Sequence, residues 1–111
     1  MLKLSDWSIQ YTKRAKLDLK MLDGSVRTQV TTAIRKVSQN PLPRQEGGYG
    51  FALGNKSGFN LSGYYRIKLK RIGIRVVYRL ERTEKGMKIV VIGARSDNEV
   101  YAEALRRQAD D

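Results

Sequence analysis

The densest positive charge in the chain lies between residues 66 and 79, where six basic side chains occur without an acidic one. They are Arg66, Lys68, Lys70, Arg71, Arg75 and Arg79. Like charges on a short segment repel one another, and a polyanionic partner offsets that repulsion. Such a partner is nucleic acid, an acidic lipid surface or an acidic protein. The alternative is a basic surface that is merely solvated.

A site made of cations can still cleave RNA, because RNA carries its own nucleophile, the 2′-hydroxyl beside each phosphate. Fixed Arg and Lys groups in a partly dry groove stabilise the negative charge that in-line attack builds on the phosphate. The reaction also needs a base, and the guanidinium of Arg66 stays protonated. Lys68 can serve if neighbouring cations disfavour its charged form. The other interpretation of Lys68, as a charge that only binds phosphate, stays open.

The residue content excludes several other chemistries. The sequence has no Cys and no His, which removes thiolate nucleophiles, imidazole bases, disulfides and most zinc sites. The glycine-rich segment 50–58 has one residue too few between its glycines for a P-loop. Three acids, Asp97, Glu99 and Glu103, are neighbours on one predicted helix, and we assign them to helix-dipole and solubility roles. We therefore expect no metal and no cofactor.

Length and charge bound the class of protein. The chain has 111 residues with 22 Lys and Arg against 11 Asp and Glu, a net charge of +11, and it is 41% hydrophobic. This predicts one domain, residues 1–111, with one modest core. The longest uncharged runs are nine residues, far below the roughly 20 apolar residues of a membrane span. Asp6 interrupts any secretion signal, so a cytoplasmic protein with no membrane contact is expected.

The first forty residues predict a strand and two helices. Alternation of Trp7, Ile9 and Tyr11 with polar residues indicates a strand near residues 5–10. Thr12 can cap a helix that ends near residues 23–24. Ser25 can cap a second helix with apolar residues at helical spacing, which stops at residues 40–41. The two helices form an αα-hairpin.

The segment 41–63 predicts a long glycine-rich loop, since it holds six of the ten glycines. Loops longer than about 12–15 residues in compact domains are usually functional or disordered. Three aromatic residues, Tyr49, Phe51 and Phe59, lie in it. They either stack on bases or dock on a partner, or they attach the loop to the body of the protein.

The rest of the chain predicts three strands and a helix. The strand 65–69 places Arg66 and Lys68 on one face, and the strand 74–81 repeats the alternation. The strand 87–94 is apolar on both faces, which indicates a central position in the sheet. Residues 96–99 have the form of a capping box at the start of a last helix. The expected order is β-α-α-β-β-β-α: an α+β fold with a small, mainly antiparallel four-stranded sheet, an N-terminal αα-hairpin packed on it and a C-terminal helix.

The segments YYRIKLKRIGIRVVYRLE and VIGARSDNEVYAEALRR closely resemble the RelE-type messenger-RNA-cleaving toxins of bacterial toxin-antitoxin pairs. The resemblance covers roughly residues 5–107 and includes the order of the elements. Its second half, with the paired G-x-R-V-V-Y and R-S-x-x-E-V-Y segments, is the specific part.

The resemblance implies a set of roles around a messenger strand in the ribosomal A site. Lys68 is implied as the general base, Arg75 as the ligand of the scissile phosphate, and Arg95 as the group that stabilises the transition state or protonates the leaving oxygen. Tyr101 is implied to stack on or orient a base. The products would be a 2′,3′-cyclic phosphate and a 5′-hydroxyl. RNA-binding charges would be Arg66, Lys70, Arg71 and Arg79. A cognate acidic antitoxin would wrap the toxin and displace or cover the C-terminal helix.

The sequence departs from the family pattern in two ways, and two alternative functions stay open. Arg66 stands where the best-known pattern has Lys, and the loop 41–63 is longer than usual in the family. Strand parity puts Arg95 on the face of Ile89 and Val91, so Arg95 reaches the Lys68 groove only beyond the strand end or through a twist or bulge. The rivals are a non-catalytic ParE-like toxin that inhibits DNA gyrase and a basic RNA-binding module. Without the resemblance, Tyr101 is expected in the core.

Overall fold

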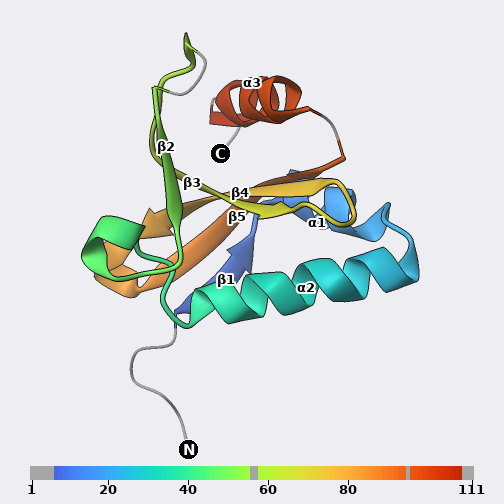
Figure 1. Ribbon diagram of the computed structural model, residues 1–111, viewed down its shortest axis with the longest axis horizontal. Helices are drawn as coiled ribbons and strands as arrows, with labels where there is room; N and C mark the ends of the chain where they lie inside the picture. The colour runs from blue at the N-terminus through green and yellow to red at the C-terminus, as the bar shows by residue number, and fades with distance from the viewer. Residues whose placement is uncertain (1–6, 56–57, 95, 109–111) are drawn as a thin grey trace, which may run out of the picture.

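The computed structural model describes residues 7–55, 58–94 and 96–108, which form an α+β architecture (Figure 1). Its elements are β1 (Ser8–Tyr11), α1 (Lys13–Lys20), α2 (Gly24–Ser38), β2 (Phe51–Gly54), β3 (Leu61–Leu69), β4 (Ile74–Glu81), β5 (Gly86–Gly93) and α3 (Asp97–Arg107). The predicted class, αα-hairpin and C-terminal helix are confirmed. The predicted strand number is wrong, because the described residues form a five-stranded sheet in the order β1-β5-β4-β3-β2.

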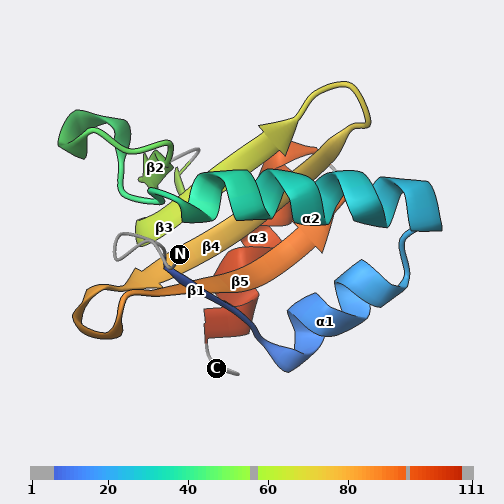
Figure 2. The same ribbon diagram turned by 90° about the horizontal axis from the view of Figure 1, so that it is seen from below.

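The sheet separates two apolar cores. Helices α1 and α2 cover one face, where they contribute Ala15, Val30 and Ile34 to the core, among others. Helix α3 covers the opposite face and contributes Val100 and Tyr101. Figures 1 and 2 show α2 and α3 on opposite sides of the strands. Among the described residues, no helix is long and apolar enough to cross a bilayer.

The first strand lies at an edge of the sheet and pairs with β5 in parallel, whereas the other neighbours are antiparallel. It begins at Ser8 and ends at Tyr11, so the prediction of residues 5–10 is displaced, and residues 5 and 6 lie outside the described part. Strand β5 is buried on both sides, as predicted. It lies between β1 and β4, so the middle strand of the sheet is β4.

The two helix starts have different outcomes. Thr12 caps α1 as predicted, since its side chain accepts a hydrogen bond from the Ala15 backbone N–H. The cap of α2 is Asp23 and not Ser25, because the Asp23 carboxylate accepts the Ser25 backbone N–H. Asp and Ser are both favourable N-cap residues. Asp23 comes before Ser25 in the chain, and its negative charge also interacts favourably with the positive N-terminal end of the helix dipole.

The prediction of one long loop over residues 41–63 is wrong. The segment contains a short 3-10 helix, Arg44–Glu46, the strand β2 and the first residues of β3. At Gly50 a Cβ would lie 2.6 Å from the Tyr78 hydroxyl oxygen and 2.7 Å from the Pro41 carbonyl oxygen. Glycine is therefore required there by close packing, and the glycine content that suggested an open loop instead permits a compact one.

A bulge changes the faces of β5. The pairing with β4 passes from Val77↔Val91 to Tyr78↔Ile89, so Val90 is the extra residue. Ile89 packs in the core under α1 and α2, whereas Val90 and Val91 both pack under α3. The expectation that Ile89 and Val91 share a face is wrong for this reason.

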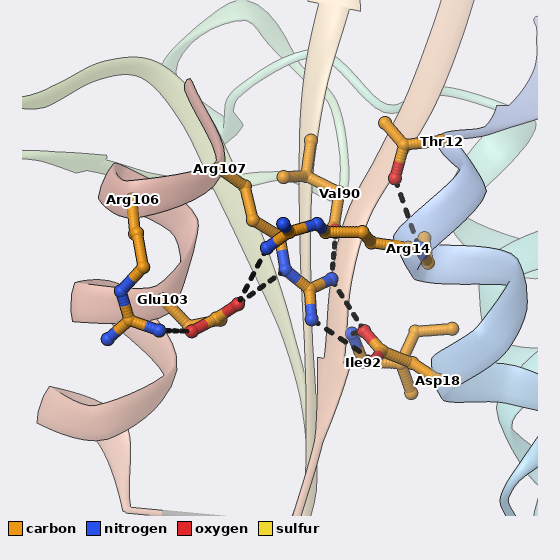
Figure 3. Close-up of polar contacts among 9 residues, drawn as sticks. Thr12, Arg14, Asp18, Val90, Ile92, Glu103, Arg106 and Arg107 are labelled. Carbon is orange, nitrogen blue, oxygen red and sulfur yellow. Dashed lines mark hydrogen bonds and ion pairs between the residues drawn. The ribbon is translucent and has the colours of Figure 1, made fainter. Parts of the chain in front are cut away.

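Helix α3 begins with the predicted capping box between Ser96 and Glu99, and its other end is tied to the sheet by Arg107 (Figure 3). The Arg107 guanidinium donates hydrogen bonds to Glu103 (2.7 Å), to Asp18 (2.8 Å) and to the Val90 carbonyl oxygen (2.8 Å). Asp18 also accepts the Ile92 backbone N–H at 3.0 Å. This buried cluster joins α1, β5 and α3.

Candidate functional site

Three of the predicted site cations meet beneath the first turn of α3. Lys68 on β3 pairs directly with Arg75 on β4, and Arg66 lies two residues from Lys68 on the same face. The predicted separation of this basic face from the apolar face of Ile67 and Leu69 is confirmed, because those two residues pack against the α1–α2 core.

The carboxylate of Asp97, the first residue of α3, lies among these cations. Its Oδ2 atom is 3.5 Å from Lys68 Nζ and 3.6 Å from Arg66 Nη1, and its Oδ1 atom is hydrogen-bonded to Arg75 Nε. We call these four residues the Asp97 cluster. Asp97 lies in the first turn of α3, which is consistent with the helix-dipole role expected from the sequence. It is in addition the shared ion-pair partner of three cations 22 to 31 positions away, which the sequence did not indicate.

The neighbouring cations make the Asp97 carboxyl more acidic. The hydrogen bond from Arg75 lowers the pKa of the Asp97 carboxyl more than burial raises it, and the charges of Arg75 and Lys68 lower it further. The carboxylate is thus held ionised at the point where the cations converge. Its side chain is 35% exposed, so an external anion can approach the same cations from solvent.

Tyr101 has its ring in the core and its hydroxyl at the edge of the Asp97 cluster. The residue is 1% exposed, and its hydroxyl oxygen accepts a 2.9 Å hydrogen bond from Arg66 Nη1. With α3 docked, the ring is covered and cannot stack on a base. In this arrangement Tyr101 orients Arg66.

The remaining predicted site residues are not gathered here. Lys70 and Arg71 are exposed in the turn between β3 and β4. Arg79 lies on β4 four residues beyond Arg75, about 13 Å along an extended strand. Arg95 lies outside the described residues.

Two further residues contribute to the site in a way that the sequence did not indicate. Phe51 at the start of β2 lies under the Arg66 guanidinium, 4.1 Å from its Cζ atom to the ring centroid, and Arg44 approaches the same ring at 5.9 Å. The only sequence signal was the aromatic content of residues 41–63. The pairing of Phe51 with Arg66 across β2 and β3 is a matter of register, which a strand not expected from the sequence could not supply.

The chemistry open to the Asp97 cluster is that of anion binding. Two guanidiniums and one ammonium directed at one point suit a phosphate that carries extra negative charge in a transition state. Lys68 is a hydrogen-bond donor to Asp97 here, whereas a general base must offer a free amine. Lys68 therefore has to leave Asp97 before it can accept a proton. Among the described residues, no three His, Cys, Asp or Glu side chains form a group that could hold a metal ion.

Comparisons with known proteins add the following. A family model described as the ParE toxin of the type II toxin-antitoxin system parDE matches residues 9–99. The free Escherichia coli RelE toxin, as a double arginine-to-alanine variant, is similar in structure, with 24% identity, a TM-score of 0.72 and coverage of 92% of this chain and 97% of that chain. The same variant in complex with an antitoxin RelBc peptide has 25% identity, a TM-score of 0.65 and coverage of 89% and 94%.

A third similar structure is the RelBE2 toxin-antitoxin complex of Mycobacterium tuberculosis, with 22% identity, a TM-score of 0.65 and coverage of 86% of this chain and 98% of that chain. A search of curated protein sequences found no match.

Proposed function

The chain belongs to the ParE toxin family of type II toxin-antitoxin systems, within the RelE/ParE superfamily, and from this premise we propose that it is a metal-independent endoribonuclease that cleaves messenger RNA in the ribosomal A site. The observation that carries the proposal is the convergence of Arg66, Lys68 and Arg75 on the Asp97 carboxylate. Three cations directed at one anion are what cleavage at a phosphodiester requires of a site without imidazole.

In the proposed reaction, a phosphate of the message takes the place of the Asp97 carboxylate. The ribose 2′-oxygen attacks the adjoining phosphorus, the bond to the 5′-oxygen of the next nucleotide breaks, and the 2′-proton passes to the general base, while the leaving 5′-oxygen takes a proton from Arg95, the role that the resemblance implies, or from water. Arg66 and Arg75 stabilise the non-bridging oxygens, and Lys68, once it has left Asp97 and lost a proton to solvent to become the neutral amine, accepts the 2′-proton. The ends are a 2′,3′-cyclic phosphate and a 5′-hydroxyl.

The partner of such a toxin is an antitoxin. Among the structures similar to this chain, a RelE variant is bound to an antitoxin RelBc peptide, and RelBE2 is a toxin-antitoxin complex. With a net charge of +11, this chain favours an acidic antitoxin, because opposite charges speed association and stabilise the complex. The place of action is the cytoplasm, where messages are translated.

A second candidate function is inhibition of DNA gyrase without RNA cleavage, as in ParE-like toxins. The observation that favours it is the family model itself, which describes a ParE toxin. In that case the Asp97 cluster would act as a structural ion-pair network.

A translation extract separates the two. The full chain is added to an extract with a defined message, and fragments with 5′-hydroxyl ends are mapped with and without ribosome assembly. We expect ribosome-dependent fragments that disappear in Arg75→Ala and persist in Lys16→Ala, which removes one exposed cation of α1 on the other layer. A parallel supercoiling assay with purified gyrase is expected to show no inhibition. Intact messages together with inhibited gyrase would establish the second function.

A further inference from the structure

A groove of about 410 Å³ lies next to the Asp97 cluster, where β2 and the segment before it meet β3. Arg44, Tyr49, Phe51, Arg66, Ile67, Lys68 and Lys70 line it. Its volume is within the range of about 300–1,000 Å³ typical of ligand sites. Four of these seven residues are cations, and no carboxylate among the described residues lines the groove.

The composition distinguishes this groove from a second cavity of about 210 Å³ beside the C-terminal half of α3. There, Asp18 and Glu103 balance Arg106 and Arg107. That cavity belongs to the ion pairs that hold α3 in place. The groove beside β3, by contrast, keeps an excess of positive charge for which a ligand of negative charge is suited.

The two aromatic rings of the groove differ in exposure. Phe51 is covered by the Arg66 guanidinium at 4.1 Å and approached by that of Arg44 at 5.9 Å, a cation–π arrangement that holds both arginines along the groove. Tyr49 is 52% exposed. Its ring is therefore the flat apolar surface that the groove offers to a ligand.

Backbone hydrogen bonds hold Tyr49 in this position. The Tyr49 N–H donates to the Asn40 carbonyl oxygen at 2.8 Å, the Gly50 N–H donates to Leu42 at 2.9 Å, and the Arg44 N–H donates to Gly50 at 3.1 Å. A ring fixed in advance loses little conformational freedom when it binds a ligand. The exposure of Tyr49 is thus a feature of an ordered segment.

Cations beside a fixed, exposed aromatic ring suit the binding of single-stranded nucleic acid, because the cations contact phosphates and the ring stacks on a base. Arg66 and Lys68 belong both to the groove and to the Asp97 cluster, so the two are continuous. We propose that this groove binds a nucleotide of single-stranded RNA adjacent to the cleaved phosphodiester, with Tyr49 stacked on its base and Arg44 and Lys70 on its phosphates. The inference rests on the proposed function, which it extends to a second nucleotide.

The test is a binding measurement that does not depend on cleavage. The full-length protein is titrated into a fluorescent, short 2′-O-methyl oligoribonucleotide, which cannot be cut, and into a strand of equal length and charge with abasic sites. Variants are Tyr49→Ala and Tyr49→Phe, and the control is Leu17→Ala, which truncates an exposed apolar side chain on α1 that is 60% exposed.

The expected result is that Tyr49→Ala weakens binding of the base-containing strand by about ten-fold or more, the loss typical of one stacked base, and leaves the abasic strand unchanged. Tyr49→Phe and Leu17→Ala should bind both strands as the wild type does. The proposal is overturned if the wild type does not prefer the base-containing strand, or if Tyr49→Ala weakens both strands equally. It is also overturned if polyglutamate competes as well as the RNA strand, which would make the groove a site for an acidic polypeptide.

Failure of this inference is distinguishable from failure of the proposed function. If messages are cleaved in the extract and Tyr49→Ala binds RNA as the wild type does, the proposed nuclease function stands and the proposed nucleotide-binding groove is wrong. If Tyr49→Ala selectively weakens binding of the base-containing strand but messages stay intact, the RNA-binding groove stands and the proposed nuclease function is wrong.

Discussion

Arg66 Nη1 donates a 2.9 Å hydrogen bond to the hydroxyl oxygen of Tyr101, 35 residues further along the chain. The same guanidinium lies over the Phe51 ring. Arg66 thus joins three elements, β2, β3 and α3, at one point. Because each contact restricts a different part of the guanidinium, the side chain is oriented before any ligand arrives, and loss of the Tyr101 hydroxyl should release one part of that restraint.

Tyr101→Phe should reduce function more than stability. Removal of one hydrogen bond to a charged group that keeps its other partners lowers the free energy of unfolding by about 1.5 kcal/mol, whereas Tyr101→Ala, which empties a buried ring position, should lower it by about 3–5 kcal/mol. We expect Tyr101→Phe to retain RNA affinity and to lose cleavage. Denaturant unfolding and mapped 5′ ends measure the two. Tyr11→Phe, which removes a phenolic hydroxyl on β1, at the opposite edge of the sheet from β2, is the matched control.

Asp97→Asn should strengthen RNA binding. The Asp97 carboxylate occupies the anion position among Arg66, Lys68 and Arg75, and removal of one charge a few ångströms away changes affinity by about five-fold in water. The gain should shrink in high salt because exposed charges are screened. Titration of a non-cleavable oligoribonucleotide at two salt concentrations measures this. Glu84→Gln, an exposed charge removed elsewhere, should change little. Weaker binding by Asp97→Asn would mean that Asp97 organises the cations more than it competes with RNA.

Arg107→Met should loosen α3. The Arg107 side chain is 11% exposed and pairs with Asp18 and Glu103, which are 19% and 12% exposed. Loss of Arg107 removes a charged partner of the partly buried Asp18 and the donor to the Val90 carbonyl oxygen, while Glu103 keeps Arg106 and Arg14, and costs about 3 kcal/mol. We expect a lower free energy of unfolding and faster amide exchange in α3 than in α2. In the double variant Arg107→Met/Asp18→Asn the loss should be smaller than the sum of the single losses; additive losses would show that the two residues do not interact.

Stability should fall in acid through Glu103. Burial acts to raise the pKa of the Glu103 carboxyl, but the hydrogen bond from Arg107 and the charges of Arg107, Arg106 and Arg14 together lower it. A carboxyl whose pKa is lower in the folded than in the unfolded state stabilises the fold above its unfolded pKa, about 4.3 for Glu, and that contribution is lost as pH falls through the folded value. Unfolding free energies from pH 7 to acid should decline less steeply in Glu103→Gln. Equal slopes would count against this origin.

Gly50→Ala should destabilise the protein while Gly24→Ala should not. A Cβ at Gly50 meets the Tyr78 and Pro41 oxygens at 2.6 and 2.7 Å and would break the hydrogen bond that Tyr78 donates to Pro41. At Gly24, in the first turn of α2, a Cβ meets nothing within 4 Å, and Ala favours helix. We expect Gly50→Ala to lose about 1–3 kcal/mol. Thermal unfolding of both variants tests this.

Local regularities of the sequence determined most of the elements. Alternation along β3 and β4 predicted which face carries Arg66, Lys68 and Arg75, because successive side chains of a strand point to opposite sides. Thr12 and Ser96 announced two helix starts, since a cap involves only residues within three positions of each other. The resemblance carried by residues 64–81 and 91–107 predicted the superfamily to which the chain belongs.

Only the tertiary structure decided what the site contains. Asp97 reaches cations 22 to 31 residues away because β3, β4 and α3 pack together, and no local pattern encodes that approach. The bulge at Val90 and the parallel pairing of β1 with β5 likewise depend on neighbouring strands. The glycine content of residues 47–63 predicted an open loop, whereas in the fold Gly50 is required by its close contacts with the Tyr78 and Pro41 oxygens. Local backbone geometry depends mainly on neighbouring residues in the sequence, whereas the convergence of charges depends on how distant segments of the chain pack together.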